Sequence, residues 1–366
     1  MSQAKPSRLP FVLFLLAFTL LGYVAGKLVV ELPMLRGQVE QLSLWDILLV
    51  PLFFFLTIGL HELGHLLGGM SAGMRFLLLI VGPLHLTRGE GGLQLRWLFN
   101  PATLGGIAAA TPDAARPLAP QLRRLIIGGP LSSLLFGGLG LGLSLWLGGR
   151  LGAWAFLVGG FSLLLFLATS VPIRAGGFMS DGMQLLEMLR GGRAVEERQR
   201  VTTILSQSYA GARPRQWNKE IITQLLNQEC EEPMRRVVAR LYAFFQALDE
   251  GSIEEAALHS TWLGDNFALF PQGFRQSITL ELALFSVLYQ NDLEVGRQWW
   301  AQSHGGVVDE ARRSLAEASL ALLAEDKDRA VRSLQRARQR VSQGMDPGLN
   351  LFTRDQLELV AQRLVA

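Results

Sequence analysis

The side chains with the clearest chemical potential lie in the sequence His61-Glu62-Leu63-Gly64-His65. On a helix, positions i and i+4 share one face, so both imidazoles can reach the same metal ion. Two imidazoles at this spacing suit adjacent corners of a tetrahedral zinc site. Glu62 lies beside them, where it can deprotonate a metal-bound water. The motif therefore predicts zinc-dependent hydrolysis.

The motif lies in an apolar segment that runs from Ile47 to about Met70, in which His61, Glu62 and His65 are the ionisable groups. Ionisable side chains are costly inside a membrane and generally serve a function there. The alternative is that these three side chains only pair with polar groups inside a helix bundle. The setting favours the metal site over this alternative.

A catalytic zinc site usually has three protein ligands and one position for water, so a third ligand is needed. Asp46 begins the same helix, about 22 Å from His61 at 1.5 Å per residue, which excludes it. Asp181 follows the last apolar segment and lies at an expected helix start. It is either the third ligand or a helix N-cap, and Glu187 is the next candidate.

The composition divides the chain into two parts. The 366 residues are 49% hydrophobic and 18% charged, with a mean hydropathy of +0.27, which excludes a disordered chain. The one cysteine excludes a Cys-rich zinc site, and the net charge of +3 does not indicate nucleic-acid binding. Residues 1–192 hold 30 of the 39 glycines, whereas residues 193–366 hold most of the charges. We predict a transmembrane domain over 1–192 and a soluble domain over 193–366.

Four apolar segments are long enough to cross a bilayer, which takes about 20 residues. They are Leu9–Gly26, Ile47–Met70, Leu125–Gly149 and Leu151–Ile173. The first exceeds the apolar length of a signal peptide, about 7–15 residues, and lacks an evident cleavage site. We therefore expect four transmembrane helices, of which the first is a retained anchor.

Basic residues in the short connections set the orientation, because they accumulate on the cytoplasmic side. With four spans, three basic regions share one side. They are the N-terminus, the loop from Gly73 to Arg124, and the segment from Arg174 to Arg193. We predict a multi-pass protein of the cell (inner) membrane, with both termini in the cytoplasm and a polar cavity that opens there.

The connection after the motif has strand character. Phe76–Thr87 is rich in β-favouring residues, Arg88–Gly92 reads as a turn, and Leu93–Trp97 alternates apolar and polar side chains. We predict a β-hairpin at or near the membrane; the alternative is a short hairpin that only connects two spans. His85 lies on this hairpin, and we expect it at the membrane interface rather than among the metal ligands.

The second half contains three similar stretches, Arg240–Leu263, Leu280–Ser303 and Leu315–Arg338, each interrupted by a short polar turn. With Gly251, Asn291 and Asp326 of these turns taken as equivalent points, the spacings are 40 and 35 residues, compared with about 34 in a tetratricopeptide repeat. We predict an all-α, tetratricopeptide-like array, with a further helix pair over 195–230. Such an array presents a surface for a protein partner; alternatively, it only caps the membrane domain.

The order of three features resembles the site-2 protease family of intramembrane zinc metalloproteases. The features are the His61–His65 motif in a span, Gly129-Pro130 in a later span, and Asp181-Gly182 after the last one. The resemblance covers about residues 45–190. It implies that zinc is bound by His61, His65 and Asp181, with Glu62 as the general base.

The resemblance also has departures. The family typically has an asparagine three residues after the Gly-Pro pair, where this chain has Ser133, and another near the last ligand, where Thr169 stands. The resemblance implies that Ser133 and Thr169 position the substrate carbonyl. It also implies that an unwound substrate adds as a strand to the hairpin.

Together these expectations describe a membrane zinc endopeptidase that cuts a peptide bond in or near a transmembrane segment of a protein or peptide substrate. The expected partners are this substrate, the lipid bilayer and a protein on the helical array, without nucleic acid. The alternative is a non-proteolytic membrane scaffold or assembly factor that acts through the array.

Overall fold

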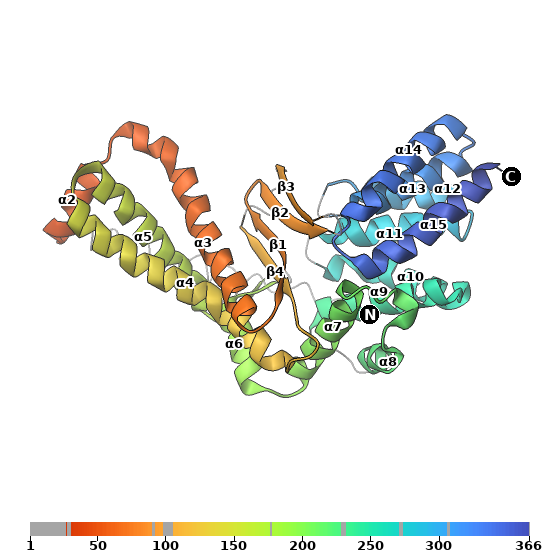
Figure 1. Cartoon of the computed structure of the whole chain (residues 1–366), viewed down its shortest axis with the longest axis horizontal. Coiled ribbons are helices and arrows are strands. Elements are labelled where there is room, and N and C mark those ends of the chain that lie inside the picture. The colour runs from red at the N-terminus through yellow and green to blue at the C-terminus, as the bar shows by residue number, and fades with distance from the viewer. Residues whose placement is uncertain are drawn as a thin grey trace.

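The computed structural model describes Lys27 and residues 31–89, 92–97, 105–175, 178–227, 232–270, 274–305 and 308–365. The described chain is mostly helical, with a small antiparallel sheet. Long apolar helices lie on one side of the molecule, the sheet stands beside them, and a group of shorter helices lies on the other side (Figure 1).

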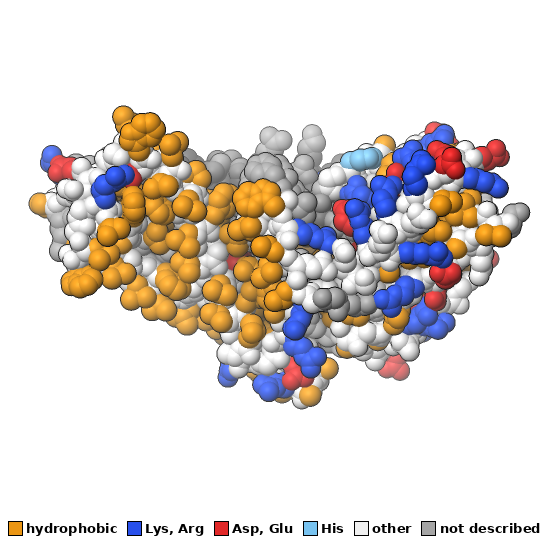
Figure 2. All heavy atoms as spheres, turned by 45° about the horizontal axis from the view of Figure 1, so that its top comes forward, with side chains coloured by type: hydrophobic (Ala, Val, Ile, Leu, Met, Phe, Trp, Pro, Cys, Tyr) orange, Lys and Arg blue, Asp and Glu red, His pale blue; other side chains and the backbone are white. Residues whose placement is uncertain are grey.

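Three helical segments of the described chain are long and apolar enough to cross a membrane. They are Leu44–Ser71, which joins the 3-10 turn η1 (Leu44–Leu49) to α3 (Val50–Ser71), then α4 (Leu118–Leu147) and α5 (Gly149–Ser170). Large hydrophobic side chains cover their surface, as expected for helices that contact lipid (Figure 2). They correspond to three of the four predicted spans. The other, Leu9–Gly26, lies outside the described residues.

Glycines let these helices pack closely. A Cβ added to Gly128 of α4 would lie 2.1 Å from the carbonyl oxygen of Gly64 on α3. Gly140 of α4 and Gly159 of α5 make a similar contact, where an added Cβ would lie 2.6 Å from the Gly159 Cα. In a bilayer, moving an apolar side chain from lipid into a helix interface gives little free energy. Small residues at the crossings instead let the helix backbones approach closely and pack against each other.

The outer ends of the helices are joined by polar contacts. The short helix α2 (Pro33–Glu40) connects to α4 through Gln38, whose side-chain amide donates to the Ser144 carbonyl at 2.9 Å. The buried Asp46 carboxylate accepts hydrogen bonds from Arg150 at 2.9 Å and Trp154 at 2.8 Å, which links η1 to α5. The start of α3 is thereby fixed against its neighbours.

The predicted hairpin is part of a four-stranded antiparallel sheet with the order β3-β2-β1-β4. The strands are β1 (Arg75–Val81), β2 (Leu84–Gly89), β3 (Gly92–Trp97) and β4 (Ile107–Thr111). The prediction of one strand over Phe76–Thr87 was wrong. Gly82, with φ of 55°, and Pro83 form a turn that divides this stretch into β1 and β2. The sheet runs back along α3, where a Cβ added to Gly59 would lie 3.7 Å from the Val81 side chain.

A short segment joins the membrane helices to the second half. It contains the two-residue strands β5 (Arg174–Ala175) and β6 (Phe178–Met179), followed by α6 (Asp181–Arg190). Gly191 and Gly192 both have positive φ, which glycine adopts without strain, and they end α6 before the next helix begins.

The second half is built from antiparallel helices. They are α7 (Arg193–Tyr209), α8 (Lys219–Asn227), α9 (Pro233–Glu250), α10 (Ile253–Asn266), α11 (Arg275–Leu288), α12 (Leu293–Gln302), α13 (Glu310–Leu323), α14 (Lys327–Arg340) and α15 (Pro347–Val365). We call this group the helical array. Its core contains fully buried aromatic side chains such as Phe244 and Phe285.

The three predicted helix pairs are present as α9–α10, α11–α12 and α13–α14. Their turns contain Gly251, Asn291 and Glu325, and all three residues have positive φ. The predicted equivalent point in the third pair, Asp326, is one residue too late; its side chain caps α14 by accepting from the Arg329 amide. Left-handed residues at matching turns explain why each pair folds back on itself.

Candidate metal centre

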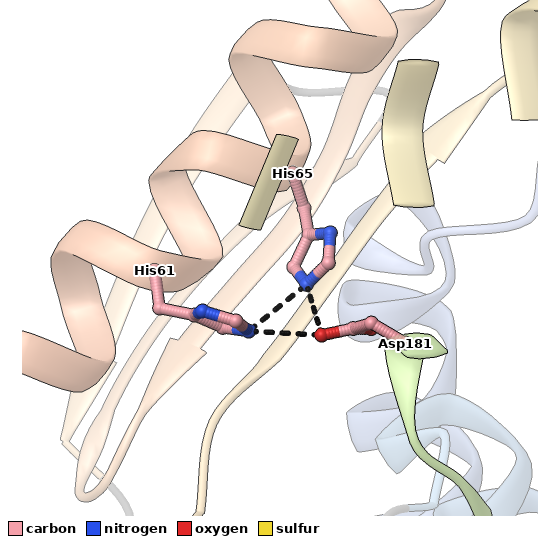
Figure 3. Close-up of side chains that lie close together, drawn as sticks. All are labelled: His61, His65 and Asp181. Carbon is pink, nitrogen blue, oxygen red and sulfur yellow. Dashed lines mark hydrogen bonds and ion pairs between the residues drawn. The ribbon is translucent and has the colours of Figure 1, made fainter. Parts of the chain in front are cut away.

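Three side chains predicted as zinc ligands meet at one point. His61 and His65 project from the same face of α3, and Asp181 approaches from the first residue of α6 (Figure 3). The His61 Nε2 atom lies 3.2 Å from His65 Nε2 and 3.2 Å from Asp181 Oδ2. His65 Nε2 lies 3.4 Å from the same oxygen. Residues 120 positions apart thus form a compact triangle of potential ligand atoms.

The size of this triangle fits zinc. Ligand atoms about 2.1 Å from a tetrahedral zinc ion lie roughly 3.4 Å from one another. The three observed separations match this edge length. Two imidazole nitrogens and one carboxylate oxygen are also a donor set that zinc commonly takes in catalytic sites. The residues present therefore fit a zinc ion with one position left for water.

Hydrogen bonds on the far side of each imidazole orient the rings. His65 Nδ1 lies 2.7 Å from the Leu125 carbonyl oxygen, which can only accept, so Nδ1 carries a proton and Nε2 is the ring atom that faces His61 and Asp181. His61 Nδ1 lies 2.8 Å from Ser133 Oγ. Supporting contacts of this kind fix the tautomer and orientation of metal-binding histidines.

The backbone of α4 gives the imidazoles their space. A Cβ added to Gly129 would lie 2.2 Å from His65 Nε2, so a larger residue there would displace the ring. Pro130 lies inside α4, one residue later. Gly129, next to this proline, is therefore the residue that leaves room for His65.

The third side chain is held by the start of α6. Ser180, and not Asp181, is the N-cap, because its hydroxyl accepts from the Met183 amide at 3.2 Å. Gly182 packs against the end of α5, where an added Cβ would lie 1.8 Å from the Ser170 carbonyl oxygen. Burial raises the pKa of Asp181, but hydrogen bonds with His61 and His65 outweigh burial and lower this pKa to about 2. Asp181 is therefore a carboxylate at neutral pH.

Glu62 of α3 lies next to the edge strand β4. A Cβ added to Gly106 would lie 2.8 Å from Glu62 Oε1, and the backbone amide of Ala108 hydrogen-bonds to its carboxylate. Glu62 also interacts electrostatically with His65 and Asp181. Its carboxylate is thus close to the triangle of His61, His65 and Asp181.

The other candidate residues lie elsewhere or have different contacts. Glu187 is held by arginines and is not part of the triangle, and Asp46 lies at the opposite end of the span. His85 is buried on β2, and burial lowers its pKa. The Thr169 hydroxyl is buried and has no hydrogen-bond partner among the described residues. The substrate-positioning roles of Ser133 and Thr169 remain predictions.

Two supporting groups were not recognised from the sequence. The Leu125 carbonyl that orients His65 is a backbone atom, so no residue type indicates it. Ser133 was selected for another role, but its buried hydroxyl contacts His61. Its spacing from Gly129 along one helix was the available signal, because residues four apart share a face.

No model of a protein family, no curated protein and no solved structure matches this chain.

Proposed function

We propose that the chain is an intramembrane zinc endopeptidase that cuts a peptide bond in or near a transmembrane segment of another protein or peptide. One observation carries the proposal. His61, His65 and Asp181 form a triangle of zinc dimensions on an apolar, membrane-length helix, with a carboxylate beside it. A hydrolytic site at this depth acts on membrane-embedded chains.

The residues have separable roles in this proposal. His61, His65 and Asp181 would hold zinc, which when bound acts as a Lewis acid toward water and a substrate carbonyl. The Glu62 carboxylate accepts a proton from the attacking water and transfers it to the nitrogen of the leaving amine. The hydrogen bonds of Ser133 and Leu125 keep both imidazoles in position during these steps.

The sheet offers a way to present an extended substrate. In the described sheet β4 pairs only with β1, so its other edge is free for a further strand. Ala108 of β4 directs its amide to Glu62, which places this free edge beside the carboxylate. A peptide paired with β4 would have its helix opened and its backbone exposed next to Glu62.

The surface of the sheet is consistent with membrane contact. Leu93, Leu95 and Trp97 alternate with polar residues on β3, so they share one face, and all three are exposed. A contiguous apolar face of this kind marks an interaction surface. In this proposal it contacts lipid where the substrate enters.

Charge supports a cytoplasmic location for the metal-proximal end of the helices. The end of α3, the start of α4 and the end of α5 lie on the same side as α6 and the array (Figure 1). Basic residues gather near these ends, among them Arg75, Arg116, Arg123, Arg124 and Arg174. By the bias of basic residues toward the cytoplasm, we propose a multi-pass inner-membrane protein with a cytoplasmic array.

The test uses the full chain with single substitutions. We expect Glu62→Gln to abolish cleavage, because a glutamine amide cannot accept the proton from water. The variant should retain zinc, because Glu62 is not one of the three proposed ligands. The exposed Glu294→Gln on α12 is the matched control and should leave cleavage unchanged. Cleavage is measured with single-span reporter proteins, tagged on both sides and co-expressed with each variant.

Metal analysis of the detergent-purified protein separates the steps. Wild type should contain about one zinc per chain, and Asp181→Ala should lose most of it. Persistent cleavage by Glu62→Gln would refute its role as the base. An absence of zinc from folded wild type would refute the enzyme and favour the scaffold alternative, in which removal of 193–366 matters and Glu62→Gln does not.

A further inference from the structure

Glu187 lies in a buried cluster of ion pairs at the junction between the membrane helices and the array. Its carboxylate is 2.5 Å from Arg235, 3.1 Å from Arg198 and 3.3 Å from Arg174. The Glu187 side chain is 3% exposed and the Arg235 side chain 5%. A buried charge with several close partners is costly to disturb, because removing one partner leaves the others without compensation.

The partners of Glu187 come from different parts of the chain. Glu187 belongs to α6, whereas Arg198 belongs to α7 and Arg235 to α9 of the array. Arg235 also donates to the Ala194 carbonyl at 2.7 Å and lies 3.4 Å from Glu197. The cluster therefore ties α6 to the first helices of the array.

The same helix carries Asp181 at its other end. Glu187 follows Asp181 by six residues, which places it about 9 Å further along the helix and on a different face. At its start, α6 is held to the end of α5 by Gly182 and by the Ser180 hydroxyl, which donates to the Val171 carbonyl at 2.6 Å. The start of α6 is thus fixed by the end of α5, whereas its second half contacts both α4, through the buried Met188, and the array, through Glu187.

We propose that Glu187 and Arg235 are positioning residues for the metal centre. They act through α6: their ion pair sets the direction of this short helix, and thereby the position of the Asp181 carboxylate relative to His61 and His65. The helical array is then part of the support of the metal site, and displacement of α9 from α6 weakens zinc binding. This inference rests on the zinc site of the proposed function.

The array contains a matched control for this ion pair. Glu281 and Arg312 form a second buried pair, with side chains 8% and 5% exposed. Arg312 also donates to Thr353 and Gln356, so this pair joins α11, α13 and α15 inside the array. It repeats the chemistry of Glu187 and Arg235 without involving α6.

The experiment compares Glu187→Gln with Glu281→Gln in the full chain in detergent. Zinc affinity is measured by competition with a chelating dye, and the geometry of the site by the visible absorption spectrum of bound Co²⁺. Loss of a supporting contact typically weakens metal binding 10- to 100-fold, and we expect an effect in this range for Glu187→Gln. Its cobalt spectrum should also change, whereas Glu281→Gln should retain both wild-type properties.

A second variant covers the case in which Glu187→Gln does not fold. Arg235→Lys keeps the positive charge but loses the planar fork that contacts both Glu187 and the Ala194 carbonyl. We expect it to weaken zinc binding less than Glu187→Gln and to shift the cobalt spectrum in the same direction.

The outcomes are distinct. If folded Glu187→Gln and Arg235→Lys both retain the wild-type zinc affinity and cobalt spectrum, the inference is overturned and the proposed zinc site still stands. Equal losses in Glu187→Gln and Glu281→Gln would also overturn it, because they would show general destabilisation of the array. Wild type that binds neither zinc nor Co²⁺ would overturn the proposed function itself.

Discussion

The membrane helices and the helical array bury opposite kinds of side chain. In α3, α4 and α5 the buried residues are mostly small or polar, such as Thr57, Ser133 and Ser144, while leucines and phenylalanines face outward. In the array, Phe244, Phe285 and many leucines and alanines are buried. Figure 2 shows the same contrast on the surface, with hydrophobic side chains over the helices and charged ones over the array.

The difference follows from the two solvents. In water, burial of apolar surface stabilises a fold by about 25 cal/mol per Å². In lipid, a leucine gains little by leaving the acyl chains, so helices associate through close backbone contact and buried polar groups. The arrangement of His61, His65 and Asp181 depends on the second kind of packing, because Gly129 at the α3–α4 crossing leaves room for the His65 ring.

The largest expected effect is Gly128→Ala at the α3–α4 crossing. The added Cβ would lie 2.1 Å from the Gly64 carbonyl oxygen, and two backbones cannot relax as a side chain can. The helices must separate next to His65, so we expect complete loss of zinc binding in detergent. Gly138→Ala on the same helix is the control, since nothing lies within 4 Å of its added Cβ. Zinc retention by Gly128→Ala would show that the crossing tolerates separation.

An intermediate effect is expected for Phe244→Ala in the array. Phe244 is fully buried and makes an edge contact with the Phe285 ring and a tilted contact with the Phe245 ring. Truncating a buried phenylalanine typically lowers the free energy of unfolding by 3–5 kcal/mol, about the amount expected here. Chemical denaturation followed by tryptophan fluorescence measures the change, with the exposed Leu258→Ala as the control. A decrease in the free energy of unfolding below about 1 kcal/mol would contradict the presence of a tightly packed hydrophobic core in the array.

The smallest effect is expected for Leu135→Ala on α4. Leu135 is 57% exposed on a membrane-length helix, so its side chain contacts lipid in both the packed and the separated state. We expect Leu135→Ala to change the free energy of unfolding by no more than about 0.5 kcal/mol. The shift in the midpoint of thermal unfolding in lipid nanodiscs measures this change. A change as large as that of Phe244→Ala would show that this face of α4 is a protein interface.

The sequence was informative where one local pattern decides the structure. The spacing of His61 and His65, the apolar length of the spans, and the polar turns near Gly251 and Asn291 all predicted observed features. Gly82-Pro83 was missed because the residues around it are uniformly β-favouring, so apolar content masked the turn that divides β1 from β2.

The relation of Glu187 to the rest of the chain could not be predicted in the same way. A carboxylate after the last span has the right chemistry for a ligand, and its distance along the chain from the histidines gives no spatial information. Its position was decided by arginines from β5, α7 and α9, which approach it only in the folded protein. Asp181, at the start of α6, is the carboxylate that the fold brings next to His61 and His65.

The separation of 120 residues between His61 and Asp181 also has a consequence for biosynthesis. A ribosome adds roughly 5–20 residues per second, so the histidine pair precedes its carboxylate partner by about 6–24 s. During this interval the nascent chain can insert α3 and α4 while the site still lacks its third side chain. Assembly of the triangle is thereby delayed until α6, which carries Asp181, has been synthesised.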